Sequence, residues 1–119
     1  MPAERHDALR ATYAAFNARD IDAAVAQMTE DVNWPNAWEG GRVFGHEAVR
    51  EYWTRQWAAI DPAVEPLEFR ERPDGTLAVG VHQVVRSRDG GLLDDRRVVH
   101  VYAFRGDLVA RMDVEDAVR

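Results

Sequence analysis

The chain has 119 residues, which corresponds to one domain spanning 1–119 with a buried core. A formal net charge of −6 and the absence of cysteine argue against nucleic-acid binding, disulfide bonds and thiolate metal sites. Neither an apolar leader nor a membrane-length hydrophobic run is present, so we expect a cytoplasmic protein that does not bind membranes.

Two helices are predicted in the first quarter of the chain. Residues 7–16 repeat apolar side chains at helical spacing, which indicates an amphipathic helix. The residues on that apolar side are Leu9, Tyr13 and Phe16. Asp20 is placed to cap a second, short helix. One side of this second helix carries Ile21, Ala24, Val25 and Met28.

A short strand over 31–34 is expected next, followed by a loop over 34–41 that contains two tryptophans. Residues 46–60 then give the clearest helical pattern in the chain. Its apolar side carries Val49, Tyr52, Trp53, Gln56, Trp57 and Ile60. The Asp61-Pro62 pair should end this helix.

The second half of the chain reads as strands separated by glycine-containing turns. The predicted strands are 65–72, 76–88, 92–105 and 108–115. Helices followed by a long antiparallel meander indicate an α+β fold, in which three helices cover one face of a strongly curved sheet.

The last strand alternates apolar and mostly charged residues, so its even-numbered residues should face the core. These residues are Leu108, Ala110, Met112 and Val114. A three-residue turn over 105–107 would pair Phe104 with Leu108. The inward residues of the preceding strand would then be Val98, His100, Tyr102 and Phe104.

Two histidines are candidate site residues. His100 lies in the middle of an otherwise apolar strand face, where it is either a hydrogen-bonded core residue or an acid or base. The direction of His82 depends on the following hairpin. A three-residue loop over 89–91 turns His82 inward, and a two-residue Gly-Gly turn points it away.

Aromatic residues are the candidate walls of a small-molecule pocket. Trp53 and Trp57 lie one helical turn apart, where they either pack in the core or line a cavity. Trp34 and Trp38, in the predicted loop, either form a lid or contact a partner. Tyr13 either packs in the core or offers its hydroxyl to the interior.

The sequence lacks the residues that several common kinds of catalytic and binding site require. Gly40-Gly41 has no following Lys-Ser/Thr for a phosphate loop, and the only serine, Ser87, is flanked by arginines. None of the four histidines is spaced i, i+4 with another, so we expect no metal and no cofactor. Charged runs such as 94–97 are interpreted as solvated strand faces, and Asp113 and Glu115 fall on the outward side.

The chain resembles the nuclear transport factor 2-like superfamily, and more narrowly its SnoaL-like bacterial branch, over residues 8–115. The segments that carry the resemblance are NARDID at 17–22, MTEDV at 28–32, GHEAV at 45–49 and VARMD at 109–113. The resemblance implies a cone-shaped sheet packed on a long helix and a pocket that opens near the loop after the first strand. It also implies a homodimer formed through the outer sheet face.

Within that superfamily, ketosteroid isomerase is a poor match. Asn36 falls where its base would be, Thr12 beside Tyr13 occupies the tyrosine position, and His100 matches the buried aspartic acid. An amide cannot abstract a proton, so that mechanism is not expected here. Epoxide hydrolase activity is also disfavoured, because Val98 and Met112 replace its charged residues. A SnoaL-type cyclase needs an inward acidic residue, and the predicted strands provide no clear one.

The resemblance and the residues together lead to two hypotheses. The first is a pocket for a small apolar carbonyl compound, with isomerisation, cyclisation or dehydration by proton transfer. His100 would be the acid or base, Asn36 and Tyr13 would orient polar groups, and the ligand would contact a further set of side chains. That set is Trp34, Trp38, Trp53, Trp57, His82, Tyr102 and Met112. The second hypothesis is a dimeric binding module without catalysis.

Overall fold

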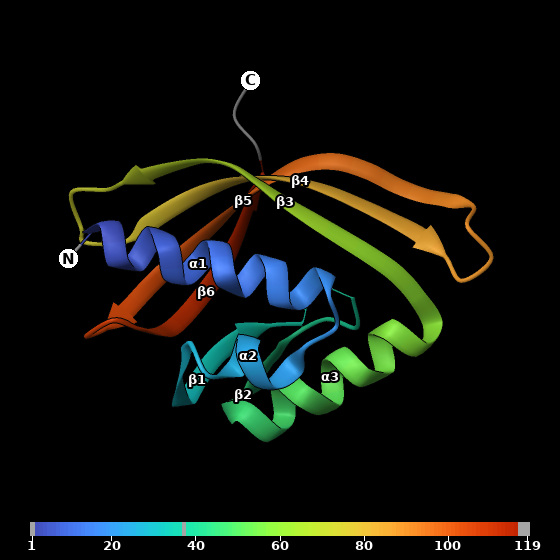
Figure 1. Cartoon of the computed structure of the whole chain (residues 1–119), viewed down its shortest axis with the longest axis horizontal. Coiled ribbons are helices and arrows are strands. Elements are labelled where there is room, and N and C mark those ends of the chain that lie inside the picture. The colour runs from blue at the N-terminus through green and yellow to red at the C-terminus, as the bar shows by residue number, and fades with distance from the viewer. Residues whose placement is uncertain (1, 37, 117–119) are drawn as a thin grey trace.

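The computed structural model describes residues 2–36 and 38–116. Helices α1 (Pro2–Asn17), α2 (Ile21–Val25) and α3 (Gly45–Ala59) lie on one side of a six-stranded sheet (Figure 1). The strands are β1 (Met28–Pro35), β2 (Arg42–Phe44), β3 (Ile60–Glu71), β4 (Leu77–Ser87), β5 (Leu92–Arg105) and β6 (Leu108–Asp116). The predicted α+β class is confirmed. No helix in this part of the chain is long and apolar enough to cross a membrane.

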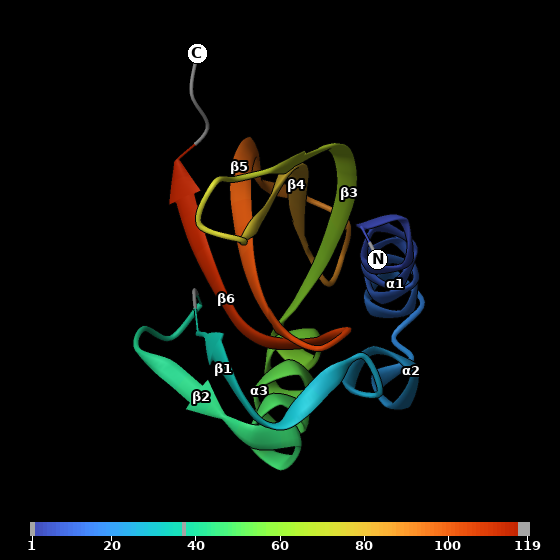
Figure 2. The same ribbon diagram turned by 90° about the vertical axis from the view of Figure 1, so that its left-hand side faces the viewer.

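The sheet has the order β2-β1-β6-β5-β4-β3, and β1 and β6 form its one parallel pair within the described residues. Figure 2 shows how strongly the long strands β3 to β6 bend, so that the sheet has a hollow and an outer face. Helices α1 and α3 lie on the hollow side. The core is therefore formed by the helices and the hollow face.

The three predicted helices are present. The side chain of Asp20 accepts a hydrogen bond from the Ala23 backbone at 3.2 Å, which caps α2 as expected. Met28 does not belong to this helix, because the chain has already turned into β1. It is nevertheless buried, on the strand.

The segment predicted as a loop contains a small hairpin. Strand β2 pairs antiparallel with the end of β1, so that Trp34 lies opposite Val43. Trp34 is therefore a buried strand residue and not part of a loop. Two short runs separated by a glycine-rich turn are too brief to show an alternating pattern, which explains why the sequence did not reveal β2.

Strand β3 begins at Ile60, five residues before the prediction, and contains two prolines. Pro62 and Pro66 have the same parity as Val64, whose backbone N–H points away from β4 toward α1. Proline lacks that N–H, so it is tolerated at these edge positions. The Asn17 side chain pairs with both backbone groups of Val64, donating to the carbonyl at 2.7 Å and accepting from the N–H at 2.9 Å.

The hairpin between β5 and β6 differs from the prediction. Phe104 pairs with Val109 rather than with Leu108, and a bulge follows that restores the expected parity, so that Tyr102 pairs with Met112. Met112 therefore faces the core as expected. Leu108, predicted to be buried, is 40% exposed, whereas Val109 is only 1% exposed.

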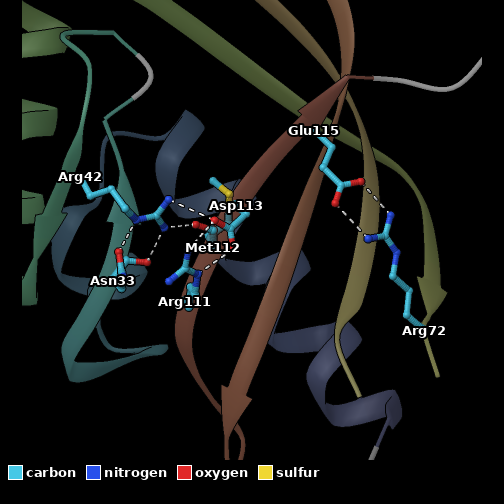
Figure 3. A network of polar contacts seen from close by, with 7 residues as sticks. All are labelled: Asn33, Arg42, Arg72, Arg111, Met112, Asp113 and Glu115. Carbon is cyan, nitrogen blue, oxygen red and sulfur yellow. Dashed lines mark hydrogen bonds and ion pairs between the residues drawn. The ribbon is translucent and has the colours of Figure 1, made fainter. Parts of the chain in front are cut away.

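Arg42 joins three strands at the seam between β1 and β6 (Figure 3). From β2, its guanidinium donates to the Asn33 side chain and to the Met112 carbonyl, and it contacts Asp113 at 3.1 Å. The register between β1 and β6 is broken between Met28 and Asn33, so the backbone ladder is incomplete there. Arg42 supplies side-chain contacts that hold the seam together.

Candidate functional site

A cavity of about 210 Å³ lies between α1, α3 and the hollow face of the sheet. Its apolar walls are largely aromatic and include Phe16, Trp34, Trp38, Tyr52, Trp53 and Tyr102. An apolar cavity of about 150 Å³ is large enough to hold benzene. The space therefore suits a small, ring-sized apolar molecule.

The aromatic walls are packed against one another. The rings of Trp34 and Trp53 meet edge to face with centroids 5.7 Å apart, and Trp34 lies 6.3 Å from Tyr102. Phe16 meets Trp53 at 5.3 Å. Such contacts restrict the rotamers of the wall residues, so the cavity has a defined shape.

A chain of three hydrogen-bonding side chains ends at the cavity. The Tyr102 hydroxyl donates to the Tyr13 hydroxyl at 2.8 Å, and the Tyr13 hydroxyl lies 2.8 Å from Nδ1 of His100. Tyr13 comes from α1, whereas the other two residues come from β5. All three are buried, and His100 is 7% exposed.

Burial keeps these three groups uncharged at neutral pH. Loss of water lowers the pKa of His100 to about 4 and raises the pKa of Tyr13 well above its ordinary value. The pKa of Tyr102 is also raised, again mainly by burial. A neutral imidazole between neutral phenols is the stable state of the chain.

The tautomer of His100 follows from the proton arrangement of this chain. With Tyr102 donating to Tyr13, the single proton of Tyr13 is donated to Nδ1 of the imidazole. A neutral imidazole with an accepting Nδ1 carries its proton on Nε2. His100 lines the cavity, so it offers an N–H donor there, suited to a carbonyl oxygen rather than to proton abstraction.

Polar residues at the mouth of the cavity were missed in the sequence. Asp94, Arg96 and Gln83 all line it. Asp94 and Arg96 belong to the run that we interpreted as a solvated face. Extending the alternation of His100 and Val98 along the same strand places both residues on the hollow side. That extension was the available signal, and it corrects the conclusion that no carboxylate points inward.

Most of the predicted site residues do line the cavity. Besides His100 and Tyr13, they are Trp34, Trp38, Trp53, Tyr102 and Met112. Trp57 lies outside the cavity. Its ring stacks on that of Trp53 with centroids 5.7 Å apart, and the guanidinium of Arg19 lies over it at 5.0 Å from the ring centroid. It packs behind the wall instead of forming it.

Asn36 does not reach the cavity. Its side-chain carbonyl accepts from the Glu39 backbone at 2.7 Å, and its amide donates to the Glu39 carboxylate at 2.9 Å. Hydrogen bonds from Arg55 and Asn36 lower the pKa of Glu39 to about 2. Asn36 thus organises the loop that carries Trp38, and Glu39 joins that loop to Arg55 of α3. The structure does not bring Asn36 to the cavity.

His82 points to the outer face of the sheet. The loop has three residues, because the Ser87 backbone N–H donates to the Gly91 carbonyl. A bulge in β5 after Leu92 then reverses the parity and pairs His82 with Arg97. His82 bonds Asp95 through Nε2 at 2.6 Å and does not line the cavity. The structure therefore does not bring His82 to the cavity.

A family model described as the SnoaL-like domain matches residues 9–112, which is most of the chain. The chain belongs to the SnoaL-like family. This SnoaL-like domain has no match among curated proteins. Its family membership agrees with the cone-shaped sheet and the three helices described above.

Solved structures share the fold over nearly the full SnoaL-like domain. TerC, co-crystallised with polyporic acid, is 26% identical, with a TM-score of 0.82 over 96% of this chain and 92% of that chain. A cystatin-fold protein from Novosphingobium aromaticivorans is 27% identical, with a TM-score of 0.77 over 97% of both chains. A Mycobacterium tuberculosis protein in complex with estradiol-17beta-hemisuccinate is 20% identical, with a TM-score of 0.78 over 93% of this chain and 92% of that chain. At this level of identity, the likeness shows the fold alone.

Proposed function

We propose that this SnoaL-like domain binds a small apolar carbonyl compound and assists proton transfer next to the carbonyl group. The chain of hydrogen bonds from Tyr102 through Tyr13 to His100 is the observation that carries the proposal. It leaves Nε2–H of His100 as the donor for the carbonyl oxygen. TerC and the Mycobacterium tuberculosis protein were each crystallised with a small molecule, which supports a ligand-binding role.

The chemistry of this arrangement is stabilisation of negative charge on oxygen. When a proton leaves the carbon beside a carbonyl, charge develops on the oxygen, and a fixed donor in a largely apolar site stabilises it. One such donor contributes about 100-fold to 1000-fold in rate. Isomerisation, cyclisation and dehydration of carbonyl compounds all pass through such a state. No cofactor is required for this step.

The base in this scheme is not a side chain beside His100. Among the described residues that line the cavity, Asp94 is the only carboxylate. It lies six residues from His100 on the same strand, roughly 20 Å along the backbone. Water that enters through the mouth would accept the proton. The distance of Asp94 also favours the second candidate, a binding module that holds a ligand without converting it.

Acetophenone tests the proposal because it joins an aromatic ring to a ketone with exchangeable methyl protons. We expect it to quench tryptophan fluorescence on binding and to exchange its methyl protons in D₂O faster than in buffer, as followed by NMR. His100→Leu should lower the exchange rate roughly 100-fold. Tyr102→Phe, which leaves His100 in place, should lower it less.

His82→Gln is the matched control, because that histidine lies on the outer face and should leave exchange unchanged. Circular dichroism melts establish that each variant is folded. Binding without exchange would identify the protein as a binding module. A folded His100→Leu variant with the wild-type exchange rate would contradict the proposal, and so would a failure of acetophenone to bind.

We also propose that two copies associate through the outer face of the sheet. Val84 and Val99 have the outward parity there, and both are only partly exposed. Sedimentation equilibrium should give twice the chain mass of 13.5 kDa. Val99→Arg should shift the protein toward the single-chain mass, and a monomeric wild type would contradict this arrangement.

A further inference from the structure

The cavity changes character along β5. His100 and Val98 form its deep part, and the next two residues on the same face are Arg96 and Asp94. The facing strand β4 changes in parallel, from buried Val81 to the partly exposed amide of Gln83. The cavity thus has an apolar, neutral interior and a charged rim on a single strand.

Arg96 has unused hydrogen-bond donors at this rim. Its Nε lies 3.0 Å from Oδ2 of Asp94, and its side chain is 59% exposed. Within residues 2–36 and 38–116, neither of its two Nη groups makes a hydrogen bond. A guanidinium held on one side by Asp94 therefore presents its remaining donors at the mouth of the cavity.

We propose that Arg96 is the recognition residue for a carboxylate on the ligand, so that the preferred ligand is an apolar carbonyl compound with an acidic end. This inference rests on the proposed function, because the apolar body of the ligand occupies the same cavity. The planar fork of a guanidinium matches the two oxygens of a carboxylate. Asp94 selects for low charge, since a doubly charged phosphate would be repelled more strongly than a single carboxylate.

The spacing of the two sites defines the length of the ligand. Arg96 and His100 are four residues apart on one strand, which separates their backbones by roughly 13 Å. A carbonyl at His100 and a carboxylate at Arg96 therefore belong to different parts of the ligand.

Phenylbutyrate and its neutral amide, phenylbutyramide, test the assignment because they differ in charge and little in shape. At neutral pH and low salt, calorimetry or fluorescence should show the acid binding roughly tenfold more tightly than the amide, as expected for a charged hydrogen bond. Arg96→Gln should remove this preference, because the acid loses more affinity than the amide. Asp94→Asn should increase the preference, because it removes the negative charge beside the bound carboxylate.

Arg97→Gln is the matched control: it makes the same change one residue away, on the outer face, and should keep the wild-type preference. Equal affinity for acid and amide in the wild type, or an unchanged preference in Arg96→Gln, would overturn the assignment while leaving the pocket intact. Binding of neither compound would overturn the proposed binding function together with this inference. Thermal melts establish that the variants remain folded.

Discussion

His100 is the residue at which burial, hydrogen bonding and the cavity meet. Its Nδ1 is occupied by Tyr13, so only Nε2 remains for a ligand. The sequence indicated its inward direction through the alternation of the strand. It did not indicate that Tyr102 completes a hydrogen-bonding chain, because that depends on where α1 crosses β5 in three dimensions.

The low pKa of His100 predicts an acid-sensitive fold. This pKa is about 4 in the folded chain, against about 6.5 for an unperturbed histidine. As the pH falls, the unfolded state takes up the proton first, so stability is lost between about pH 6.5 and about pH 4. Across that interval the loss amounts to roughly 3 kcal/mol.

Urea denaturation at pH 7 and at about pH 4.5 measures this loss. Between these two pH values, the free energy of unfolding of the wild type should fall by roughly 2 to 3 kcal/mol more than that of His100→Gln. In this variant the titrating imidazole is absent, and the carboxylates titrate as before. An equal loss in both proteins would show that His100 protonates as easily in the folded chain as in the unfolded chain.

At the scale of elements, α1 does more than cover the core. Its last residue, Asn17, satisfies the backbone of Val64 on the open edge of β3. Edge strands with free backbone groups pair with other chains, and natural proteins block them. The helix end and the two prolines of β3 together close this edge.

Asn17→Ala should therefore weaken the fold and promote aggregation. Two hydrogen bonds are lost and the Val64 backbone is left unpaired, which costs roughly 1 to 3 kcal/mol in urea denaturation. Light scattering on warming should show earlier aggregation than in wild type. Thr54→Ala is the control, because the Thr54 hydroxyl bonds only its own helix, and its effect should stay within about 0.5 kcal/mol. Similar losses in the two variants would argue against edge protection.

Elements with long periodic patterns were predictable, whereas short or irregular ones were not. Helix α3 and strands β4 to β6 follow clear spacing, and their bounds agree with the prediction to within about two residues. Strand β2 has three residues, and β3 has prolines at edge positions that resemble the end of a strand. Bulges shift the register by one residue in two hairpins and have no local sequence signature here: one turns His82 outward, and the other restores the expected parity of β6 after a turn that is shorter than predicted.

At the scale of the whole molecule, the small hairpin of β1 and β2 is attached to the main sheet through an irregular seam. Arg42 connects the hairpin to β6, and a second pair, Arg72 with Glu115, joins the tip of the hairpin between β3 and β4 to the end of β6 (Figure 3). The two arginines differ in the groups that they contact. Arg42 bonds backbone and side chain across a seam, whereas Arg72 makes an exposed ion pair.

Arg42→Gln should loosen the hairpin that carries the cavity loop. We expect faster hydrogen–deuterium exchange of the backbone amides at 33–44, because the Met112 carbonyl and Asn33 lose their common donor. Arg72→Gln should change exchange little, since a solvent-exposed ion pair contributes little to stability. Unchanged exchange at 33–44 in Arg42→Gln would show that β1 and β6 hold together without this side chain.

The fold class and the deep cavity residues were predicted from the sequence, whereas the rim of the site was missed. Asp94 and Arg96 belong to a charged run whose composition is typical of solvated strands, and that composition outweighed the alternation that places both residues on the face of Val98 and His100.

The division of the cavity between the middle of the sheet and its periphery has a practical consequence for protein engineering. The deep hydrogen-bonding groups come from the centre of β5 and from α1, whereas Trp38, Asp94 and Arg96 come from a loop and a hairpin end. Libraries randomised at these peripheral positions would alter which compounds are accepted while conserving the buried machinery. The architecture therefore offers a starting scaffold in which the rim can be varied independently of the buried hydrogen-bonding chain.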